Sequence, residues 1–529
     1  AFRMRLLLIL TTLAAHCFAY KILVYNMKLG HSHSKFAGML ADVLVEAGHD
    51  VTSLIPELEP ALADGTKLSK VIRIDRSNET KKVMEDFYGH PDNNFFVTDF
   101  FHPRQQAIVG EFMSRAFGSM CKTTLAQTKL LDELKAAQFD ALINENFDFC
   151  GTGLAHLLEI PALIITSSTG MFDNVARDLG IPFPSSYIPS FPVETVDPHS
   201  IWSRLHNLIY STAFLAEKDQ SMIACQAAYR ERFGHAFPSL SNLTAHSALV
   251  LTNQEPILDY AYPTLKKIID VGGLGSHVSQ PLDQYWNGIL SLRRSTVLIS
   301  FGSIAQSVTM PAHYKEGLLK AIASMPETTF IWKYEQPEDE FGRGVASTVA
   351  NLVLTKWMPQ SDLLGDKRVV AFVSHAGGAS VQEVAMHAVP TLFIPLFAEQ
   401  IRNAGMMEKN GMARVYDKRD IPNSDKLSAA IKEVMADEGI RQAANRIASL
   451  LANRPYHPRD LFIKHVEFVA RFGPISSFTP ASVDMTFVER YNLDIAFIAS
   501  LLAFSVILSC LWLGSKLLSM LRIRKTKLE

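Results

Sequence analysis

The first half of the chain alternates apolar runs of strand length with amphipathic stretches of helical periodicity. KILVYNM, from residue 21, and VTSLIP, from residue 51, enclose a stretch whose apolar positions between residues 36 and 44 fall on one helical face. FDALINE and PALIITS, within residues 139–167, enclose a second helix around residues 151–158. Strands that alternate with helices in this order predict a parallel sheet covered by helices on both faces.

The second half repeats this pattern after a stretch rich in proline and glycine. The run ALVLTN ends at residue 253, and the residues that follow, with Pro256 and Gly272-Gly273, are typical of a linker between domains. TVLISF, from residue 296, opens a second series of strands, and residues 425–470 are predicted to be helical. The pattern predicts an α/β protein with two Rossmann-like domains that face each other across a cleft.

Both ends of the chain carry apolar segments. Residues 1–19 combine two arginines with an apolar run and a small-residue cleavage site, the form of a secretory signal peptide. Residues 495–514 contain no charge, and at about 1.5 Å per residue they span a hydrocarbon core of roughly 30 Å. The basic tail, residues 515–529, predicts a cytoplasmic end and a lumenal body. Lys525 and Lys527 resemble a signal for return to the endoplasmic reticulum, although a basic stop-transfer flank has the same form.

Composition and cysteine usage agree with a lumenal body. Of the 529 residues 48% are apolar and the net charge is −2, so the basic footprint of a nucleic-acid-binding protein is missing from the sequence. Cys17 belongs to the signal peptide and Cys510 to the membrane segment, which leaves Cys121, Cys150 and Cys225 and allows one disulfide at most. Two sequons for N-glycosylation begin at Asn78 and Asn242.

Residues 357–403 place polar and glycine-rich loops where apolar strands end. VVAFV, residues 369–373, is predicted to be a buried strand, and Ser374-His375-Ala376-Gly377-Gly378 leads from it into a helix. The unpaired N–H groups and the dipole of such a helix N-terminus attract an anion. A second strand, PTLFIPL, is followed by Ala398-Glu399-Gln400 at the edge where open parallel sheets bind ligands.

An ordinary βαβ unit would also contain a glycine turn, but the spacing of four other residues is more specific. Trp357 and Gln360 flank a Met-Pro, His375 opens the next loop, and Glu383 follows eight residues later in its helix. This set resembles the donor-nucleotide signature of the UDP-glycosyltransferases, most closely the membrane-bound UDP-glucuronosyltransferases. The resemblance covers the whole chain and implies the GT-B glycosyltransferase fold, with UDP-glucuronate or UDP-glucose as donor substrate and no cofactor.

The resemblance implies a role for each polar group of the donor loops. Trp357 would stack on uracil, Gln360 would hydrogen-bond the nucleoside, and Glu383 would accept from the ribose hydroxyls. Glu399 and Gln400 would hold the hydroxyls of the sugar. The diphosphate would be bound by residues at two strand ends, namely Gly302, Ser303, His375, Gly377, Gly378 and Ser380.

Two positions depart from the family pattern. Ala379 stands where the family often has asparagine, so one side-chain contact to phosphate is lost. Glu399-Gln400 stands where the family usually has Asp-Gln, which leaves the identity of the sugar open. The sequence shows no histidine or cysteine pairing at the spacing of a metal site, and we expect none.

A base for the acceptor hydroxyl is expected in the polar loop after the first strand, because the pKa of histidine lies near working pH. This loop, residues 28–34, offers His31 and His33, and Ser34 is predicted to cap the helix that follows. The family places its base sixteen residues before the histidine of a Gly-His pair, here His49. The resemblance therefore implies His33 as the base and leaves His31 as a solvated loop residue.

A base of this kind is usually oriented by a carboxylate. Family members carry aspartate five residues before a cysteine, and counting back from Cys150 gives Glu145, which we predict to be the catalytic partner of His33. Asp148 is the alternative, and capping the next helix is the other interpretation of that residue.

These observations predict an inverting transferase, active in detoxification, that moves a sugar from a UDP-sugar to a hydroxyl of a small lipophilic acceptor. Its membrane helix would contact lipid in the endoplasmic reticulum. The predicted segments are a signal peptide (1–19), an acceptor-binding domain (20–275), a UDP-sugar-binding domain whose helices cross back (276–470), a juxtamembrane segment (471–494), a membrane helix (495–514) and a tail (515–529). The acceptor wall is expected from an aromatic cluster, for which core packing is the alternative: Phe87, Tyr88, Phe95, Phe96, Phe100 and Phe101.

Two other classes of function fit parts of the pattern. A nicotinamide-dependent oxidoreductase also uses Rossmann turns, but the sequence lacks GxGxxG with an acid about twenty residues beyond it. A catalytically inactive membrane protein could keep the nucleotide-binding fold, although His33 and a carboxylate at position 145 argue for catalysis. The donor sugar, the acceptor and the oligomeric state stay open.

Overall fold

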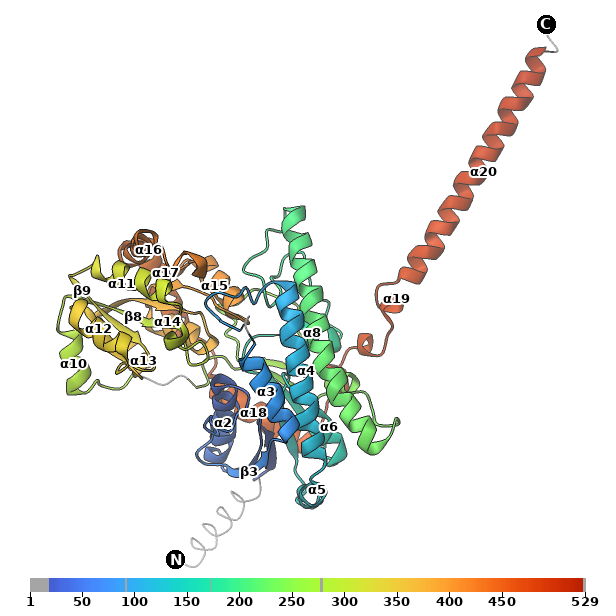
Figure 1. The fold of residues 1–529 in the computed structure, drawn as a ribbon. Helices are drawn as coiled ribbons and strands as arrows, with labels where there is room; N and C mark the ends of the chain where they lie inside the picture. Colours follow the sequence, from blue (N-terminus) through green and yellow to red (C-terminus); the bar gives the residue numbers. More distant parts are fainter. Residues whose placement is uncertain (1–18, 91–92, 172, 276–278, 527–529) are drawn as a thin grey trace, which may run out of the picture. The chain divides into compact units, whose positions relative to one another are not determined.

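The computed structural model describes residues 19–90, 93–171, 173–275 and 279–526, and the chain forms two compact units, Ala1–Phe478 and Thr479–Glu529 (Figure 1). The first unit contains two parallel sheets with their helices, and the second contains the long C-terminal helix. All but the last residue of the predicted signal peptide lies outside the described residues.

The first sheet has seven parallel strands in the order β3-β2-β1-β4-β5-β6-β7. Its strands are β1 (Lys21–Tyr25), β2 (Asp50–Glu57), β3 (Lys70–Asp75), β4 (Ala141–Glu145), β5 (Ala162–Ser167), β6 (Leu249–Thr252) and β7 (Ile268–Asp270). The run predicted as a linker therefore contains a strand, β7, which pairs with β6 from Val250 to Thr252. A strand of three residues is too short to produce a periodic pattern, which is why the sequence did not indicate it.

Helices cover both faces of this sheet. They are α2 (His31–Glu46), α3 (Asn78–Tyr88), α4 (Pro103–Leu125), α5 (Thr128–Ala136), α6 (Cys150–Leu157), α7 (Asp173–Asp178), α8 (Ile201–Phe233) and α9 (Leu240–Ala245). The two longest, α4 and α8, run side by side (Figure 1). The side chain of Ser200 caps α8 by accepting from the Ser203 amide, and α8 ends at Gly234 in a left-handed conformation.

The second sheet has six parallel strands in the order β10-β9-β8-β11-β12-β13, again the doubly wound Rossmann arrangement. Its strands are β8 (Ser295–Ser300), β9 (Thr328–Lys333), β10 (Leu352–Thr355), β11 (Val369–Ser374), β12 (Thr391–Phe393) and β13 (Ala413–Val415). β9 contains two of the largest fully buried residues, Trp332 and Phe330, and β8, β9 and β11 are buried on both faces along most of their length, as is typical of covered parallel strands.

The helices of the second domain are α10 (Gln284–Leu290), α11 (Ala312–Ala323), α12 (Glu340–Thr348), α13 (Gln360–Leu364), α14 (Gly378–His387), α15 (Gln400–Lys409), α16 (Ser424–Ala436), α17 (Glu438–Ala452) and α18 (Pro458–Phe472), with short 3-10 turns at η2 (Ser307–Thr309), η3 (Lys418–Asp420) and η4 (Ser476–Phe478). α18 leaves the second sheet and packs on the first. Its buried Phe462 and Val466 share a hydrophobic core with Ile22 and Val24 of β1.

The second unit consists of η5 (Ala481–Val483), α19 (Phe487–Arg490) and α20 (Leu493–Thr526). Within α20, the apolar segment Leu493–Leu521 is 29 residues long and contains an 18-residue window with a mean hydropathy of 2.4, none of which is buried. By length and composition this helix can cross a membrane.

Candidate active site

Three neighbouring strands of the first sheet bring His33, Glu145 and Ser168 together. His33 lies in the first turn of α2 after β1, Glu145 is the last residue of β4, and Ser168 follows β5. The Nδ1 atom of His33 is 3.0 Å from Glu145 Oε1 and 3.0 Å from Ser168 Oγ, and the Ser168 amide donates to the same Glu145 oxygen at 3.0 Å. The three residues form one hydrogen-bonded group at the carboxyl edge of the sheet.

The charges of this group favour an imidazole that holds a proton on Nδ1. Burial lowers the pKa of His33, but the charge and the hydrogen bond of Glu145 outweigh burial and leave that pKa raised. Burial raises the pKa of Glu145, but the charge of His33 and the hydrogen bonds from His33 and Ser168 lower it by more than burial raises it. The pKa of Glu145 is therefore below its usual value. Glu145 is therefore an anion that orients the ring and leaves Nε2 for a ligand.

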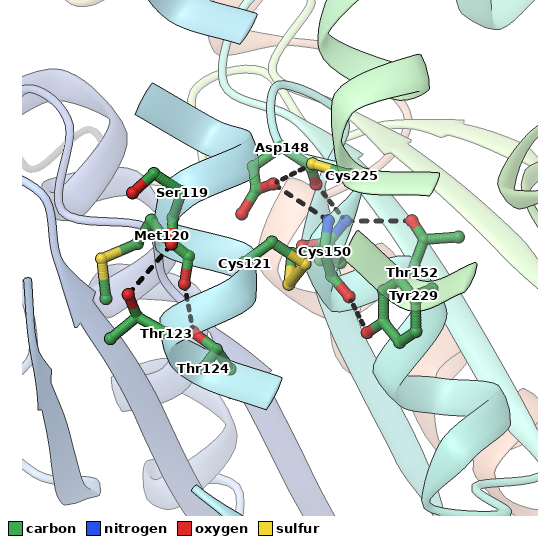
Figure 2. The surroundings of a disulfide bond; sticks show 11 residues. Ser119, Met120, Cys121, Thr123, Thr124, Asp148, Cys150, Thr152, Cys225 and Tyr229 are labelled. Carbon is green, nitrogen blue, oxygen red and sulfur yellow. Dashed lines mark hydrogen bonds between the residues drawn. A yellow bond between two sulfur atoms is a disulfide. The ribbon is translucent and has the colours of Figure 1, made fainter. Parts of the chain in front are cut away.

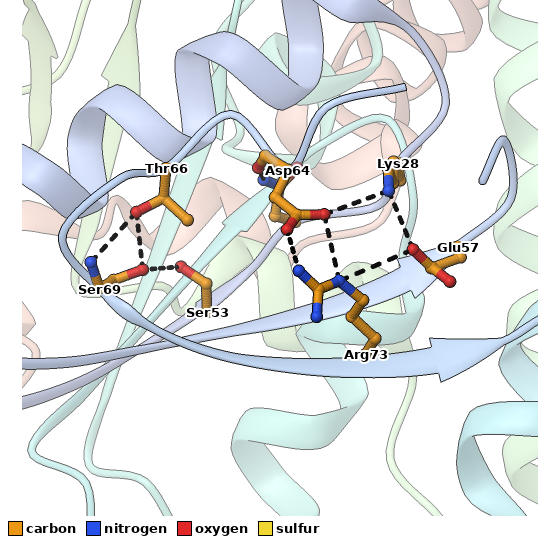
Figure 3. A network of polar contacts seen from close by, with 8 residues as sticks. Lys28, Ser53, Glu57, Asp64, Thr66, Ser69 and Arg73 are labelled. Carbon is orange, nitrogen blue, oxygen red and sulfur yellow. Dashed lines mark hydrogen bonds and ion pairs between the residues drawn. The ribbon is translucent and has the colours of Figure 1, made fainter. Parts of the chain in front are cut away.

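A network of ion pairs and hydrogen bonds holds the loop between β1 and α2 in place (Figure 3). The buried Nζ of Lys28 donates to Glu57 at 2.9 Å and to Asp64 at 3.1 Å. Arg73 on β3 also binds Asp64 and lies 3.9 Å from Glu57. Because Lys28 lies three residues before the start of α2, these ion pairs fix the backbone that enters the first turn of that helix.

The first turn of α2 differs from the prediction in two ways. The helix begins at His31 with Gly30 as its N-cap, so Ser34 is not a cap; its backbone amide instead bonds Gly30 within the helix. His31 is half-buried in the cavity wall, and its ring lies 6.3 Å from the ring of Trp357 in an edge-on arrangement. The prediction of a solvated loop residue is therefore wrong, since the earlier helix start turns His31 toward the second domain.

Asp148 lies beside the only disulfide of the described residues, Cys121–Cys150 (Figure 2). Its Oδ1 accepts from the Cys150 amide at 2.9 Å and from the Cys225 thiol at 3.4 Å. The N-cap of α6 is Phe149, so Asp148 contacts the first turn of that helix without being its cap. Burial raises the pKa of Asp148 to about 6. Glu145, not Asp148, is thus the carboxylate in contact with His33.

At the carboxyl edge of the second sheet, His375 stands between two glycines. A Cβ added at Gly302 would lie 2.5 Å from His375 Nε2, and one added at Gly377 would lie 2.6 Å from it. Gly302 also has a φ of +85°, which other residues rarely adopt. Burial lowers the pKa of His375 to about 4, so its ring is neutral and can donate one hydrogen bond at the N-terminus of α14.

The nucleoside group predicted from the sequence is assembled on α13 and α14. Gln360 begins α13, and its Nε2 donates to Ser380 Oγ at 3.0 Å and to the carboxylate of Glu383. Trp357 precedes α13 and is 64% exposed, so one face of its ring is available for stacking. Lys333 Nζ lies 5.8 Å from the centroid of that ring.

The predicted sugar-binding pair lies at the start of α15, with the two side chains in different situations. Gln400 is buried, and its Oε1 accepts from the amides of Leu396 and Phe397 at 2.9 and 3.1 Å. Burial raises the pKa of Glu399, the charge of Glu145 adds to this, and the charge of His33 opposes it. The carboxyl of Glu399 is therefore close enough to the His33 group to interact with its charges.

One cavity of about 570 Å³ connects the two edges. His33, Trp357, Gln360, His375, Glu383, Glu399 and Gln400 all line it, as do Gly302, Ser303, Gly377, Gly378 and Ser380. Of the aromatic cluster, Phe87, Tyr88, Phe95, Phe100 and Phe101 line the cavity. Phe96 does not, because it is fully buried against Phe301 in the core of the second domain, 5.4 Å between ring centroids.

Sequence reasoning missed Ser168 and Lys333. Each directly follows or ends a strand, β5 or β9, which is the signal that could have found them. The sequon residues Asn78 and Asn242 are exposed, and their glycosylation stays a prediction. Among the residues that the structure describes, no three histidine, cysteine or acidic side chains gather as a metal-binding group.

Comparison with known proteins agrees with this geometry. The family described as "UDP-glucoronosyl and UDP-glucosyl transferase" matches residues 20–526. Human UDP-glucuronosyltransferase 1A10 is 28% identical over 497 residues, which is 90% of this chain and 88% of that protein. UDP-glucuronosyltransferase 1A9, also from Homo sapiens, is 27% identical over 90% of this chain and 88% of its own length.

Solved structures share the fold. The glycotransferase of kitacinnamycin superposes with a TM-score of 0.58 at 15% identity, covering 86% of this chain and all of the other. LpCGTa, solved in complex with UDP, superposes with a TM-score of 0.53 at 17% identity over 85% of this chain and 99% of its own. The chain has the GT-B fold, belongs to the UDP-glucuronosyl and UDP-glucosyl transferase family, and is a UDP-glycosyltransferase.

Proposed function

We propose that this enzyme transfers the sugar of a UDP-sugar, glucuronic acid or glucose, to a hydroxyl of a small lipophilic acceptor with inversion at the anomeric carbon. The observation that carries the proposal is the His33–Glu145–Ser168 group, which opens into the same cavity as the predicted UDP-binding residues. The aromatic side chains of the first domain make the acceptor end of that cavity apolar, which suits a lipophilic compound.

In the proposed reaction the acceptor oxygen attacks the anomeric carbon while the bond from that carbon to the diphosphate oxygen breaks. The hydroxyl proton passes to Nε2 of His33, and the electron pair of the broken bond leaves with UDP. Glu145 stabilises the imidazolium that forms, since its charge already raises the pKa of His33. A single displacement from the face opposite the diphosphate inverts the anomeric configuration.

The departing charge would be stabilised by the second domain. The N-terminus of α14, beginning at Gly378, presents unpaired amides, and the neutral ring of His375 can donate to a phosphate oxygen. Trp357 would stack on uracil, while Gln360 and Glu383 would bind the nucleoside. Glu399 lines the same cavity as His375 and interacts with the charge of His33, and in this proposal it would accept from sugar hydroxyls.

The proposal includes a place in the cell. α20 is long and apolar enough to anchor the enzyme in a membrane, and a disulfide joins Cys121 to Cys150, as oxidising compartments permit. Both features support anchoring in the endoplasmic reticulum with the catalytic unit in the lumen and the exposed Asn78 and Asn242 glycosylated there. A role in detoxification would follow from lipophilic acceptors.

The proposal is tested by transfer assays with the full chain in membranes. UDP-glucuronate and UDP-glucose are supplied side by side with a panel of phenols, and the configuration of the product is read by NMR. An inverted glycoside from either donor supports the proposal. Tight UDP binding without transfer from either donor would support the catalytically inactive alternative instead.

A further inference from the structure

The apolar end of the cavity contains two buried polar side chains, Gln106 and Lys218, and a partly buried one, Glu217, for which the proposed transfer has no use. Gln106 comes from α4, and Glu217 and Lys218 come from α8, the helix packed along α4. All three line the cavity among aromatic rings. Polar groups in such a place are costly to bury unless hydrogen bonds compensate them, so their presence needs a reason.

Glu217 and Lys218 form an ion pair inside the cavity wall. Lys218 Nζ is 3.3 Å from Glu217 Oε1, and the two side chains are 5% and 12% exposed. The ammonium also lies over two rings, 4.1 Å from the centroid of Phe147 and 5.3 Å from that of Phe214. The pair as a whole is neutral, and it offers ammonium donors beside carboxylate acceptors.

Gln106 adds an acceptor to this pair. Its side chain is 6% exposed, and its Oε1 has no hydrogen-bond partner among the described residues. One turn further along α4 lies Gly110, where an added Cβ would be 2.6 Å from Cγ of Glu217. This close approach keeps the Glu217 side chain against the face of α4 that carries Gln106.

Phe147 fixes the distance between this polar group and the His33 group. Its ring centroid is 5.0 Å from that of His33 on one side and 4.1 Å from Lys218 Nζ on the other. The charge of Lys218 is also among the influences that lower the pKa of His33. The two polar groups are thus separated by about one aromatic ring, with apolar surface between them.

We propose that Gln106, Glu217 and Lys218 form a subsite that binds a second hydroxyl of the acceptor, about one ring system away from the hydroxyl that receives the sugar. The inference rests on the proposed function and narrows its acceptors to lipophilic diols. The bound hydroxyl accepts from the Lys218 ammonium and donates to Glu217 or to the unpartnered Oε1 of Gln106.

The charge of the subsite favours a hydroxyl over an ion. A carboxylate would add a second negative charge beside Glu217, and an amine would add a second positive charge beside Lys218. Either would leave a net charge in a cavity lined by phenylalanines, whereas a hydroxyl leaves the buried pair neutral.

Three naphthalene acceptors test the subsite: 2-naphthol, 2,7-dihydroxynaphthalene and 7-methoxy-2-naphthol. With the full chain and saturating UDP-sugar, we expect kcat/KM for the diol to exceed that for 2-naphthol by about tenfold or more, beyond the twofold from its two reactive hydroxyls. The methyl ether can accept from Lys218 but cannot donate, so its kcat/KM should lie between those of 2-naphthol and the diol. Equal kcat/KM for the diol and 2-naphthol, once that twofold is removed, would overturn the proposal.

Variants assign the preference to residues. Glu217→Gln, which keeps the shape, Lys218→Met and Gln106→Leu should each reduce the diol preference severalfold or more. Lys122→Met is the matched control, because Lys122 pairs with Glu231 at 2.7 Å across the same two helices but outside the cavity, with side chains 52% and 65% exposed. An unchanged preference in Glu217→Gln together with Lys218→Met would refute the subsite.

Acceptor binding separates this inference from the proposed transfer. Calorimetric titration of the three naphthalene compounds into the UDP-bound full chain measures the diol preference whether or not sugar is transferred. Preferential binding of the diol without transfer would support the subsite and refute the transfer. Transfer to all three compounds, together with equal binding affinities, would support the proposed transfer and refute the subsite.

Discussion

The glutamate at position 145 is one methylene longer than the aspartate that the resemblance would place there, yet its carboxylate reaches His33. The structure shows how: Glu145 is the terminal residue of β4, and the Ser168 amide from the neighbouring β5 holds the same oxygen that contacts the ring. Two hydrogen bonds to one oxygen restrict the longer side chain. The extra rotatable bond therefore does not loosen the pair.

Replacing this carboxylate should move the pH profile in a defined direction. In the proposed reaction His33 must be neutral to accept the proton, so kcat/KM should rise as the pH passes the pKa of His33. Glu145→Gln removes the charge that raises this pKa and leaves burial, which lowers it, so the rising limb should shift to lower pH. Because the imidazolium loses its stabilising partner, the plateau rate should fall by about 10–100-fold. A pH series of kcat/KM measures both effects.

Asp148→Asn is the matched comparison for Glu145→Gln, since Asp148 is the other acidic residue between the end of β4 and the start of α6. Asparagine can still accept from the Cys150 amide, so transfer should stay within about twofold of the parent and the rising limb should not move. If Asp148→Asn abolished transfer while Glu145→Gln left the profile unchanged, the assignment of the partner would be wrong.

The residues of the site differ in how far the sequence could predict them. His33 and Glu145 followed from a resemblance and a count along the chain, and the structure places the two in contact. Ser168 follows a strand, which marks it as a candidate, but its role depends on His33, 135 residues away in the sequence. Gln106 could not be predicted, because a glutamine on one helix gains a role only through neighbours on the helix packed against it. His31 was predicted wrongly as a solvated loop residue, and Phe96 was left open between the acceptor wall and the core. The direction of each side chain depends on where its helix or loop begins.

At the scale of elements, the close packing of His375 between Gly302 and Gly377 fixes the position of its ring at the predicted UDP-binding end of the cavity. Gly377→Ala would place a methyl group 2.6 Å from His375 Nε2 and displace the ring from the N-terminus of α14. UDP affinity should fall by about tenfold, measured by calorimetry. Gly288→Ala, in α10 of the same domain, meets nothing within 4 Å and serves as control. Equal UDP affinity in the two variants would contradict the assigned role of His375.

The Cys121–Cys150 bond ties α4 to α6 across 29 residues of sequence (Figure 2). Closing a loop of this length constrains the unfolded chain, so the double variant Cys121→Ala/Cys150→Ala should lose about 3–4 kcal/mol of unfolding free energy. Denaturant titration of the full chain in detergent measures this, with Cys225→Ala, which touches the same cluster without the bond, as comparison. A loss no larger than that of Cys225→Ala would mean that the bond adds no stability.

Element prediction succeeded where periodicity was long enough. The strands that became β1, β4, β5, β8 and β11 were located within about two residues, because each is apolar on both faces and ends at a polar loop. β3, β7, β9, β10 and β13 were not predicted. β3 and β10 are partly exposed edge strands, and β7 and β13 have three residues each, so these four lack the continuous apolar run by which the predicted strands were found. β9 is buried along its whole length but was not assigned from the sequence.

At the scale of the catalytic unit, the carboxyl edges of two parallel sheets share one cavity, and each contributes half of the chemistry. In the proposed reaction, the first sheet would supply the base and the acceptor wall, and the second would supply the UDP-binding groups. Hydrogen bonds also join the two domains directly. Lys418 of η3 donates to the carbonyls of Phe95 and Thr98, and Gln382 of α14 donates to Asn253. The sequence predicted two facing domains but not these contacts, which depend on how the domains meet.

The central claim is that the base and the UDP site are separate halves of one reaction, and His33→Ala tests it most directly. Transfer to a phenolic acceptor and UDP affinity are measured on the same preparation. The account predicts that kcat falls by about 10²–10⁴-fold while the dissociation constant for UDP stays within about twofold. Equal losses of transfer and UDP binding, or transfer that survives the substitution, would contradict it.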